Sequence, residues 1–221
     1  MKRDALFNMI EQQIRPWDVS NPAVLKLLHD LPRAGFLPAS HQAFAYVDTE
    51  LPLVIDGVDT GTQLLTPRVV ARIVQAVDVQ KNETVAQVGL GDGYMAALLA
   101  RFAKTVTVYE LNETILHFAQ RNLNQHHVRN VNYELGDGLK LSTEKFDVLV
   151  LAGSVAHLTH TMKQRIHVGG RLFAIIGTAG APTMHAVLVH RVGESDWTQE
   201  VLFETIAPAL TQSDTRPTFV F

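Results

Sequence analysis

The chain has 221 residues, a formal net charge of −3 and no cysteine, which excludes disulfides, thiolate zinc sites and cysteine nucleophiles. With 47% hydrophobic and 19% charged residues, it has the composition of a folded globular protein and lacks the basic character of a nucleic-acid-binding surface. No segment approaches the ~20 apolar residues of a membrane span, and the amino terminus lacks a signal-peptide core. We therefore expect a cytoplasmic protein with neither membrane nor nucleic-acid partners.

Prolines divide the first 80 residues into short pieces. Apolar residues at helical spacing predict helices over residues 4–14, over residues 22–30 and after Pro67. Asn21 and Thr66 each precede a proline, which is the pattern of an N-cap residue followed by proline at the first helical position. We expect residues 1–80 to form an N-terminal helical subdomain that covers the substrate.

From residue 84 onward, β-rich segments alternate with helical ones. We expect strands at residues 84–88, 105–109, 131–135, 146–151, 171–176, 186–191 and 201–205. We expect helices at residues 94–102, 112–124 and 157–167, the last of them ended by Gly169-Gly170. This alternation predicts an α/β fold, a doubly wound and mainly parallel sheet, over residues 81–221. A ligand would bind beyond the carboxyl ends of its strands. The apolar tail, residues 219–221, is expected to dock on its own domain.

Three polar or glycine-rich segments fall at predicted strand ends. Gly89, Gly91 and Gly93 follow the first strand, Glu110 ends the second, and Gly136-Asp137-Gly138 follows the third. Glycines allow the backbone to approach a ligand closely. An acid roughly 20 residues after the first glycine can accept hydrogen bonds from ribose hydroxyls. The spacing therefore indicates a nucleoside cofactor, although plain turns and a solvated strand-end acid would produce each segment on its own.

The details of the glycine loop distinguish between cofactors. The dinucleotide pattern G-x-G-x-x-G requires glycine where this chain has Tyr94, so an NAD-dependent oxidoreductase is disfavoured. The G-x-G-x-G form is typical of S-adenosylmethionine (SAM) methyltransferases, and Asp137 fits their adenine-contacting acid. The complete set of candidate cofactor-binding residues is Gln87, Gly89, Gly91, Gly93, Glu110, Leu111, Asp137 and Gly138.

Other catalytic patterns are missing from the sequence. It contains no G-x-S-x-G elbow and no phosphate-binding P-loop, so serine hydrolase and nucleotide triphosphatase activities have no support. His157 and His160 are spaced to face one way on a helix, but no HExxH motif or ordered acid accompanies them. We expect no metal site.

Five segments carry a resemblance to the protein-L-isoaspartate O-methyltransferases that covers nearly the whole chain. They are LPRAGFLP at residues 31–38, AYVDTELPL at 45–53, LAG at 151–153, GGRL at 169–172 and APAL at 207–210. The first two are specific to this family. The resemblance implies a Rossmann-like SAM methyltransferase fold, SAM as cofactor with S-adenosylhomocysteine as its product, and methyl transfer to isoaspartyl carboxylates of damaged proteins or peptides.

Two positions depart from the family pattern. Where the family has a serine at the methyl-accepting site this chain has Leu65, and where it has an acid before the glycine loop this chain has Gln87. We expect Thr66 or Thr62 to supply the missing hydroxyl, with Thr60 also near; a threonine before proline is also a common helix cap. A different methyl acceptor and a catalytically silent family member both remain open, and the sequence leaves the oligomeric state undetermined.

Overall fold

The structure is a computed structural model that describes residues 2–140 and 144–210. Its centre is a seven-stranded sheet in the order β5-β4-β3-β6-β7-β8-β9. The strands are β3 (Thr84–Val88), β4 (Thr105–Glu110), β5 (Val131–Leu135), β6 (Phe146–Val155), β7 (Ile166–Ile176), β8 (Met184–Arg191) and β9 (Trp197–Thr205). The expected tail contact of residues 219–221 lies outside the described residues.

The predicted mainly parallel sheet is confirmed. β3 pairs in parallel with both β4 and β6, and the parallel set continues to β5 on one side and β7 on the other. β8 and β9 add antiparallel pairs at one edge. β3 is the first strand of this sheet along the chain. The next strands, β4 and β5, are added on one side of it, and β6 and β7 are added on the other. The strand order therefore reverses direction at β3, which is where ligands of such sheets bind.

Both faces of the sheet are covered. Successive buried residues of one strand belong to different hydrophobic clusters, so Val148 packs on one face and Leu149 on the other. Three helices follow strands of the sheet, namely α4 (Tyr94–Ala100), α5 (Glu113–Gln125) and the short α6 (His160–Gln164). The predicted cap of α5 is confirmed, since Asn112 Oδ1 accepts hydrogen bonds from the amides of Thr114 at 2.9 Å and Ile115 at 3.3 Å.

The helix expected over residues 157–167 is wrong over much of its length. Only His160–Gln164 is helical, and β7 already begins at Ile166, which pairs with Phe146. Gly169 and Gly170 therefore lie inside a strand instead of ending a helix. Gly169 has a φ of 88°, which side-chain-bearing residues rarely adopt, and the register of β7 against β6 is irregular at this point.

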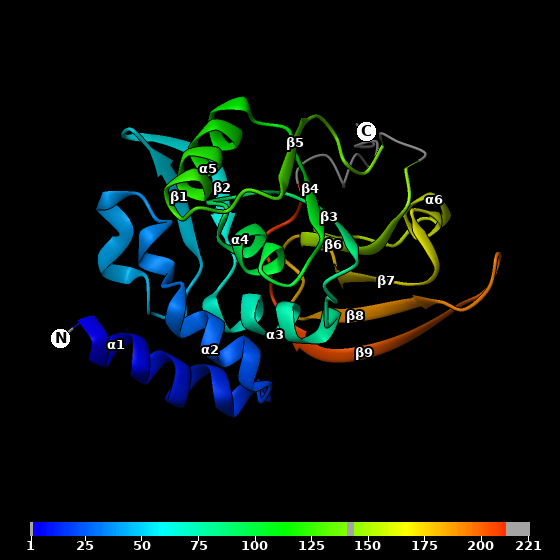
Figure 1. Ribbon diagram of the computed structural model, residues 1–221, viewed down its shortest axis with the longest axis horizontal. Coiled ribbons are helices and arrows are strands. Elements are labelled where there is room, and N and C mark those ends of the chain that lie inside the picture. The colour runs from blue at the N-terminus through cyan, green and yellow to red at the C-terminus, as the bar shows by residue number, and fades with distance from the viewer. Residues whose placement is uncertain (1, 141–143, 211–221) are drawn as a thin grey trace, which may run out of the picture.

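The N-terminal region lies along one side of the sheet (Figure 1). It contains α1 (Lys2–Met9), which continues through a π-helical turn (Ile10–Ile14) and a 3-10 turn (Arg15–Trp17), then α2 (Pro22–Asp30), further 3-10 turns (Arg33–Gly35 and Ala39–Phe44) and α3 (Pro67–Val77). The predicted Asn21 cap is confirmed, because its side chain accepts from the amides of Ala23 and Val24. Apolar residues of these helices join the main hydrophobic cluster of the sheet.

A β-hairpin also lies within this region, where only helices were expected. It consists of β1 (Leu51–Ile55) and β2 (Val58–Leu64). Asp56 and Gly57 form its turn with φ values of 51° and 82°, the left-handed pair typical of a tight hairpin turn. The inward residues of β1 pack beside Ile115 of α5, and the hairpin is seen next to α5 in Figure 1.

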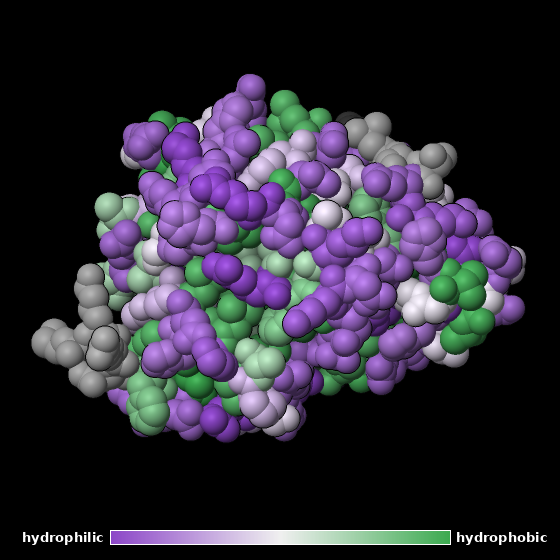
Figure 2. Space-filling view, in the orientation of Figure 1, coloured by the Kyte–Doolittle hydropathy of each residue, from purple (hydrophilic) through white to green (hydrophobic). Residues whose placement is uncertain are grey.

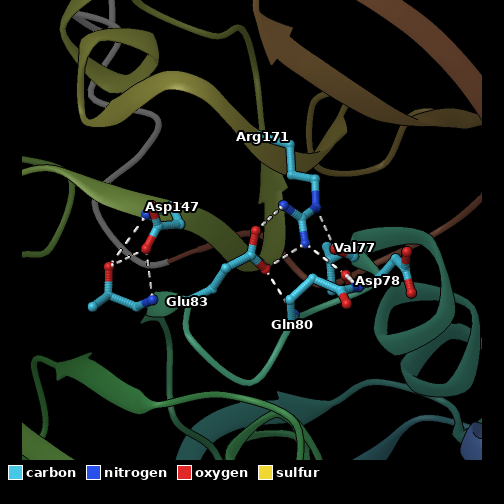
Figure 3. Close-up of polar contacts among 7 residues, drawn as sticks. Val77, Asp78, Gln80, Glu83, Asp147 and Arg171 are labelled. Atoms are coloured by element: carbon cyan, nitrogen blue, oxygen red, sulfur yellow. Dashed lines mark hydrogen bonds and ion pairs between the residues drawn. The ribbon is translucent and has the colours of Figure 1, made fainter.

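A polar network links β7 to the end of α3 and to the start of β3 (Figure 3). Arg171 on β7 donates two hydrogen bonds of 2.8 Å to the two carboxylate oxygens of Glu83. The same guanidinium donates to the backbone carbonyls of Val77 and Asp78 at the end of α3. Burial favours the neutral form of Glu83, but the hydrogen bonds from Arg171 and from a backbone amide outweigh it, so the pKa of Glu83 lies below its ordinary value.

The face of the molecule shown in Figure 2 is largely polar. Hydrophilic residues cover most of it, and hydrophobic ones gather over the N-terminal helices at its lower left. Within the described part of the chain, no helix has both the length and the apolar character needed to cross a membrane.

Candidate active site

A cavity of about 250 Å³ opens at the carboxyl ends of β3, β4, β5 and β6. Its walls come from the glycine loop, from the residues just after β4 and β5, from the end of the hairpin and from the segment that follows β9. It is therefore located where the strand order switches, as the sequence predicts. Seven of the eight predicted cofactor-binding residues line it, namely Gln87, Gly89, Gly91, Glu110, Leu111, Asp137 and Gly138.

The glycine loop turns sharply between β3 and α4. Gly89, Gly91 and Gly93 have φ values of 84°, 57° and 86°, so each occupies the left-handed region that glycine adopts without strain. Gly93 is not among the cavity-lining residues. It is the N-cap residue of α4, and a Cβ built on it would lie 3.2 Å from the Cβ of Ala119 on α5, so its small size serves helix packing.

Glu110 closes the glycine loop against β4. Its Oε2 accepts a hydrogen bond from the Leu90 amide at 2.9 Å, and its Oε1 accepts from the amides of Leu111 at 2.9 Å and Asn112 at 3.0 Å. A carboxylate can accept about four hydrogen bonds. Three backbone amides fix its orientation and leave acceptor capacity on Oε2 toward a ligand.

Asp137 forms the turn after β5 and also lines the cavity. Its Oδ1 accepts from the Leu139 amide at 2.9 Å, and its Oδ2 lies 3.2 Å from Nζ of Lys140. The side chain thus has the turn role that its aspartate-glycine sequence suggests, while its position on the cavity wall keeps it available to a ligand.

Gln87 lies on β3 at the position where the sequence resemblance implies an acid. The residue is only 1% exposed. Its Nε2 donates to the Gly89 carbonyl at 2.8 Å, whereas its Oε1 is buried and has no hydrogen-bond partner among the described residues. Because buried acceptors are normally paired, this oxygen is a candidate contact for a ligand.

The three threonines near the predicted acceptor site differ in whether they line the cavity and in their hydrogen bonds. Leu65 and Thr62 line the cavity, and Thr66 does not. Thr66 occupies the N-cap position of α3 without a side-chain capping bond, and its buried Oγ1 has no partner among the residues that the structure describes. Thr60 donates to the Leu53 carbonyl at 2.8 Å inside the hairpin. Thr62 is therefore the threonine that the hairpin carries to the cavity wall.

Three buried polar residues at the cavity were missed by sequence reasoning. Arg33, Asp92 and Tyr94 are 2%, 6% and 2% exposed, and all three line the cavity. Arg33 Nη2 donates to the Leu65 carbonyl at 3.0 Å, and Asp92 Oδ1 accepts from the Tyr94 amide at 3.0 Å. Arg33 Nη1, Asp92 Oδ2 and Tyr94 Oη have no hydrogen-bond partner within the described ranges.

These groups are electrostatically coupled. Burial raises the pKa of the Asp92 carboxyl, and the Arg33 guanidinium opposes that rise. Burial likewise lowers the pKa of Arg33 against the opposing charge of Asp92, and burial raises the pKa of the Tyr94 hydroxyl. The only available signal in the sequence was that Arg33 lies in a segment specific to the family and Asp92 in the glycine loop.

No group of three or more histidine, aspartate or glutamate side chains within residues 2–140 and 144–210 is placed to hold a metal ion. The cavity therefore presents glycine backbone, carboxylates, one guanidinium and uncharged polar groups to a ligand.

The model of the protein-L-isoaspartate(D-aspartate) O-methyltransferase family matches residues 4–212. The chain belongs to this family. The resemblance expected from the sequence is thereby confirmed, over both the N-terminal region and the sheet. The Rossmann-like fold expected from that resemblance is also confirmed, since the two solved structures described below share this architecture.

Relatives of similar length carry the family name. A protein-L-isoaspartate O-methyltransferase of Picosynechococcus sp. is 32% identical over 174 residues, which cover 78% of this chain and 76% of the relative. One from Rhodopseudomonas palustris is 31% identical over 196 residues, covering 88% of this chain and 87% of the relative.

Two solved structures share the fold. A protein-L-isoaspartate O-methyltransferase superposes with a TM-score of 0.77 at 23% identity; the match covers 95% of this chain and 65% of that longer chain. A Plasmodium falciparum protein described as a beta-aspartate methyltransferase, solved in complex with S-adenosyl-L-homocysteine, gives a TM-score of 0.72 at 15% identity and covers 94% of this chain and 97% of its own.

Proposed function

We propose that the protein is a SAM-dependent methyltransferase that esterifies the free carboxylate of L-isoaspartyl residues in damaged proteins. The observation that carries the proposal is the convergence of the glycine loop, Glu110 and Asp137 on one cavity in a chain of this family. The cytoplasmic location and the exclusion of nucleic-acid partners remain predictions of the sequence.

The residues that line the cavity fit the cofactor. Glu110 would accept from ribose hydroxyls with its remaining acceptor capacity, and Asp137 would face the adenine amine. Gln87 Oε1 is a buried acceptor in need of a donor, and the backbone of Gly89 and Gly91 has no side chain that would block close approach. When bound, SAM supplies an electrophilic methyl group on a sulfonium.

Methyl transfer to a carboxylate requires little acid–base catalysis from the chain. A carboxylate acceptor has a pKa near ~4 and is already ionised at neutral pH, so no general base has to remove a proton. The chain must instead orient the acceptor oxygen toward the methyl group and keep water away. Leu65, 7% exposed at the cavity wall, excludes water, and the Thr62 hydroxyl is the donor we assign to the acceptor carboxylate.

Leu65 also supports a second candidate, a SAM-dependent methyltransferase with a less polar acceptor. An isobutyl group in place of a hydroxyl makes the acceptor side of the cavity more apolar. The two candidates share every cofactor contact and differ only in the molecule that receives the methyl group.

The test is methyl transfer from labelled SAM to a pair of synthetic peptides that differ only in one isoaspartyl or aspartyl linkage. We expect ester formation on the isoaspartyl peptide alone, with one S-adenosylhomocysteine released per ester. Binding of SAM without transfer to either peptide would contradict the proposed acceptor and favour the second candidate or a silent family member.

A further inference from the structure

We propose that Asp92 and Arg33 together recognise the zwitterionic amino-acid end of the cofactor, with Asp92 Oδ2 accepting from its ammonium and Arg33 Nη1 donating to its carboxylate. The inference rests on the proposed cofactor but not on the proposed acceptor. It assigns a function to the two buried charged side chains of the cavity wall, each of which has one atom without a hydrogen-bond partner among the described residues.

A turn contact accounts for only one of the two oxygens of the Asp92 side chain. Its Oδ1 accepts from the Tyr94 amide two residues later, and an asparagine or serine would do this without a charge. The second oxygen is buried, lines the cavity and has no partner in the described part of the chain. A buried carboxylate without a partner is costly, so a charge at this position calls for a cation.

Arg33 presents the complementary half. Its Nη2 is held by the Leu65 carbonyl, which aligns the guanidinium and leaves Nη1 buried and unpaired. Arg33 is the one lysine or arginine among the described residues that line the cavity. An anion that enters this cavity therefore has a single cationic side chain to meet.

The pairing of the two charges selects the ligand group. An acceptor carboxylate brought to Arg33 would also face the like charge of Asp92, which acts electrostatically on Arg33. A group that carries one ammonium and one carboxylate satisfies both residues at once. The amino-acid end of SAM has this composition.

The departure at Gln87 is consistent with this arrangement. Gln87 Oε1 can accept one hydrogen bond from an ammonium but brings no charge. Asp92, five positions later in the glycine loop and also on the cavity wall, supplies the negative charge that Gln87 lacks. The ammonium, with three donors, can use both oxygens.

Calorimetric titration with four ligands tests the proposal: S-adenosylhomocysteine, its decarboxylated analogue, its deaminated analogue, and 5′-methylthioadenosine, which lacks the amino-acid end. Asp92→Asn keeps the oxygen that accepts from the Tyr94 amide and should weaken binding of the two ligands with an ammonium by about tenfold or more. Arg33→Gln should weaken binding of the two ligands with a carboxylate by a similar factor. Both variants should bind 5′-methylthioadenosine as the parent does.

Asp48→Asn is the matched control. The Asp48 carboxylate also acts electrostatically on Arg33, but it pairs with Arg68 at 2.9 Å and does not line the cavity, so this variant should show no preference among the four ligands. If Asp92→Asn or Arg33→Gln weakened binding of all four ligands equally, the charges would have only a structural role, and the proposal would be overturned.

The parent protein gives a result even if a variant does not fold. If it binds the decarboxylated and deaminated analogues as tightly as S-adenosylhomocysteine, the proposal fails. Selective binding of S-adenosylhomocysteine by a protein that does not methylate the isoaspartyl peptide would support this inference while contradicting the proposed acceptor.

Discussion

At the scale of single residues, Leu65 sets the character of the predicted acceptor side of the cavity. Leu65 occupies the position of the family's serine and is buried at the cavity wall. Its backbone carbonyl accepts a hydrogen bond from Arg33, a contact that does not involve the Leu65 side chain. A side-chain substitution here should therefore change the chemistry of the acceptor side without moving the loop.

We expect Leu65→Ser to raise the rate of methyl transfer to an isoaspartyl peptide by up to about 10²-fold, the effect of one oriented donor in a transition state. The affinity for S-adenosylhomocysteine should not change, and its measurement in the same variant is the control. A rate equal to that of the parent, in a variant with unchanged cofactor affinity, would show that position 65 does not touch the acceptor.

The two threonines give a second residue-scale prediction. Thr62→Val should lower methyl transfer about tenfold or more, because it removes the hydroxyl that lines the cavity, while Thr66→Val should have the smaller effect. Steady-state rates at saturating SAM compare the two variants. The reverse order of effects would transfer the donor role to the unpaired Thr66 hydroxyl.

Glu110 joins a binding role to a structural one. Glu110→Ala should weaken SAM binding by more than the roughly 1.5–3 kcal/mol of a hydrogen bond to a charged group, because it also releases the Leu90 amide and with it the glycine loop. Glu110→Gln retains an acceptor oxygen and should lose less. Unchanged affinity in folded Glu110→Ala, measured by calorimetry, would remove this residue from the site.

At the scale of elements, local patterns were predictable and long-range pairings were not. Asn21 and Asn112 cap helices through contacts within three residues, so short sequence motifs reveal them. The hairpin β1–β2 was missed although Asp56-Gly57 is a strong turn signal, because Pro52 suggested a break; Pro52 in fact pairs with Gln63. Gly169-Gly170 was misread because only the pairing of β7 with β6 decides its conformation.

In the candidate site, too, features set by local sequence were predictable and features set by long-range contacts were not. The glycine loop and Glu110 follow from spacing along the chain, and the structure brings them to one cavity. Arg33 lies 32 residues from the Leu65 carbonyl that it binds, and no spacing rule connects those positions. The unequal roles of Thr62 and Thr66 likewise depend on the hairpin.

The network of Arg171 and Glu83 supports a prediction about element docking. Glu83→Gln should lower the free energy of unfolding by about 1.5–3 kcal/mol at pH 7, because Arg171 loses its charged partner. Since the pKa of Glu83 in the folded state lies below the ordinary value of 4.5, its contribution is complete above that pH and is lost as the pH falls through the lowered value.

Urea unfolding at pH 7 and at several pH values below 4.5 measures this. The parent should lose stability more steeply with acidification than Glu83→Gln. Parallel pH profiles for the two proteins would show that the Glu83 carboxylate is not stabilised by Arg171. The two residues meet beside the amino-terminal end of β3 (Figure 3), and neither lines the cavity, so affinity for S-adenosylhomocysteine should be unaffected.

At the scale of the whole molecule, the N-terminal helices and the sheet share one hydrophobic cluster, and the cavity is lined by residues from both regions. The subdomain boundary near residue 80 remains a prediction of the sequence. Because residues such as Arg33 and Thr62 contribute to the cavity from the N-terminal region, ligand binding should stabilise both regions together.

S-adenosylhomocysteine at 100 times its dissociation constant should add about 2.7 kcal/mol to the free energy of unfolding. For a chain of this length that corresponds to a rise of about 5–10 °C in the melting temperature. NAD at the same concentration should produce no shift, and a shift with NAD alone would contradict the cofactor assignment.

The most direct measurement is a crystal structure of the complex with S-adenosylhomocysteine. We expect adenine beside Asp137, ribose hydroxyls on Glu110, and the amino-acid end between Asp92 and Arg33, with the sulfur facing the side of the cavity formed by Leu65 and Thr62. A ligand bound away from the glycine loop, or with its adenine far from Asp137, would contradict this assignment of the site.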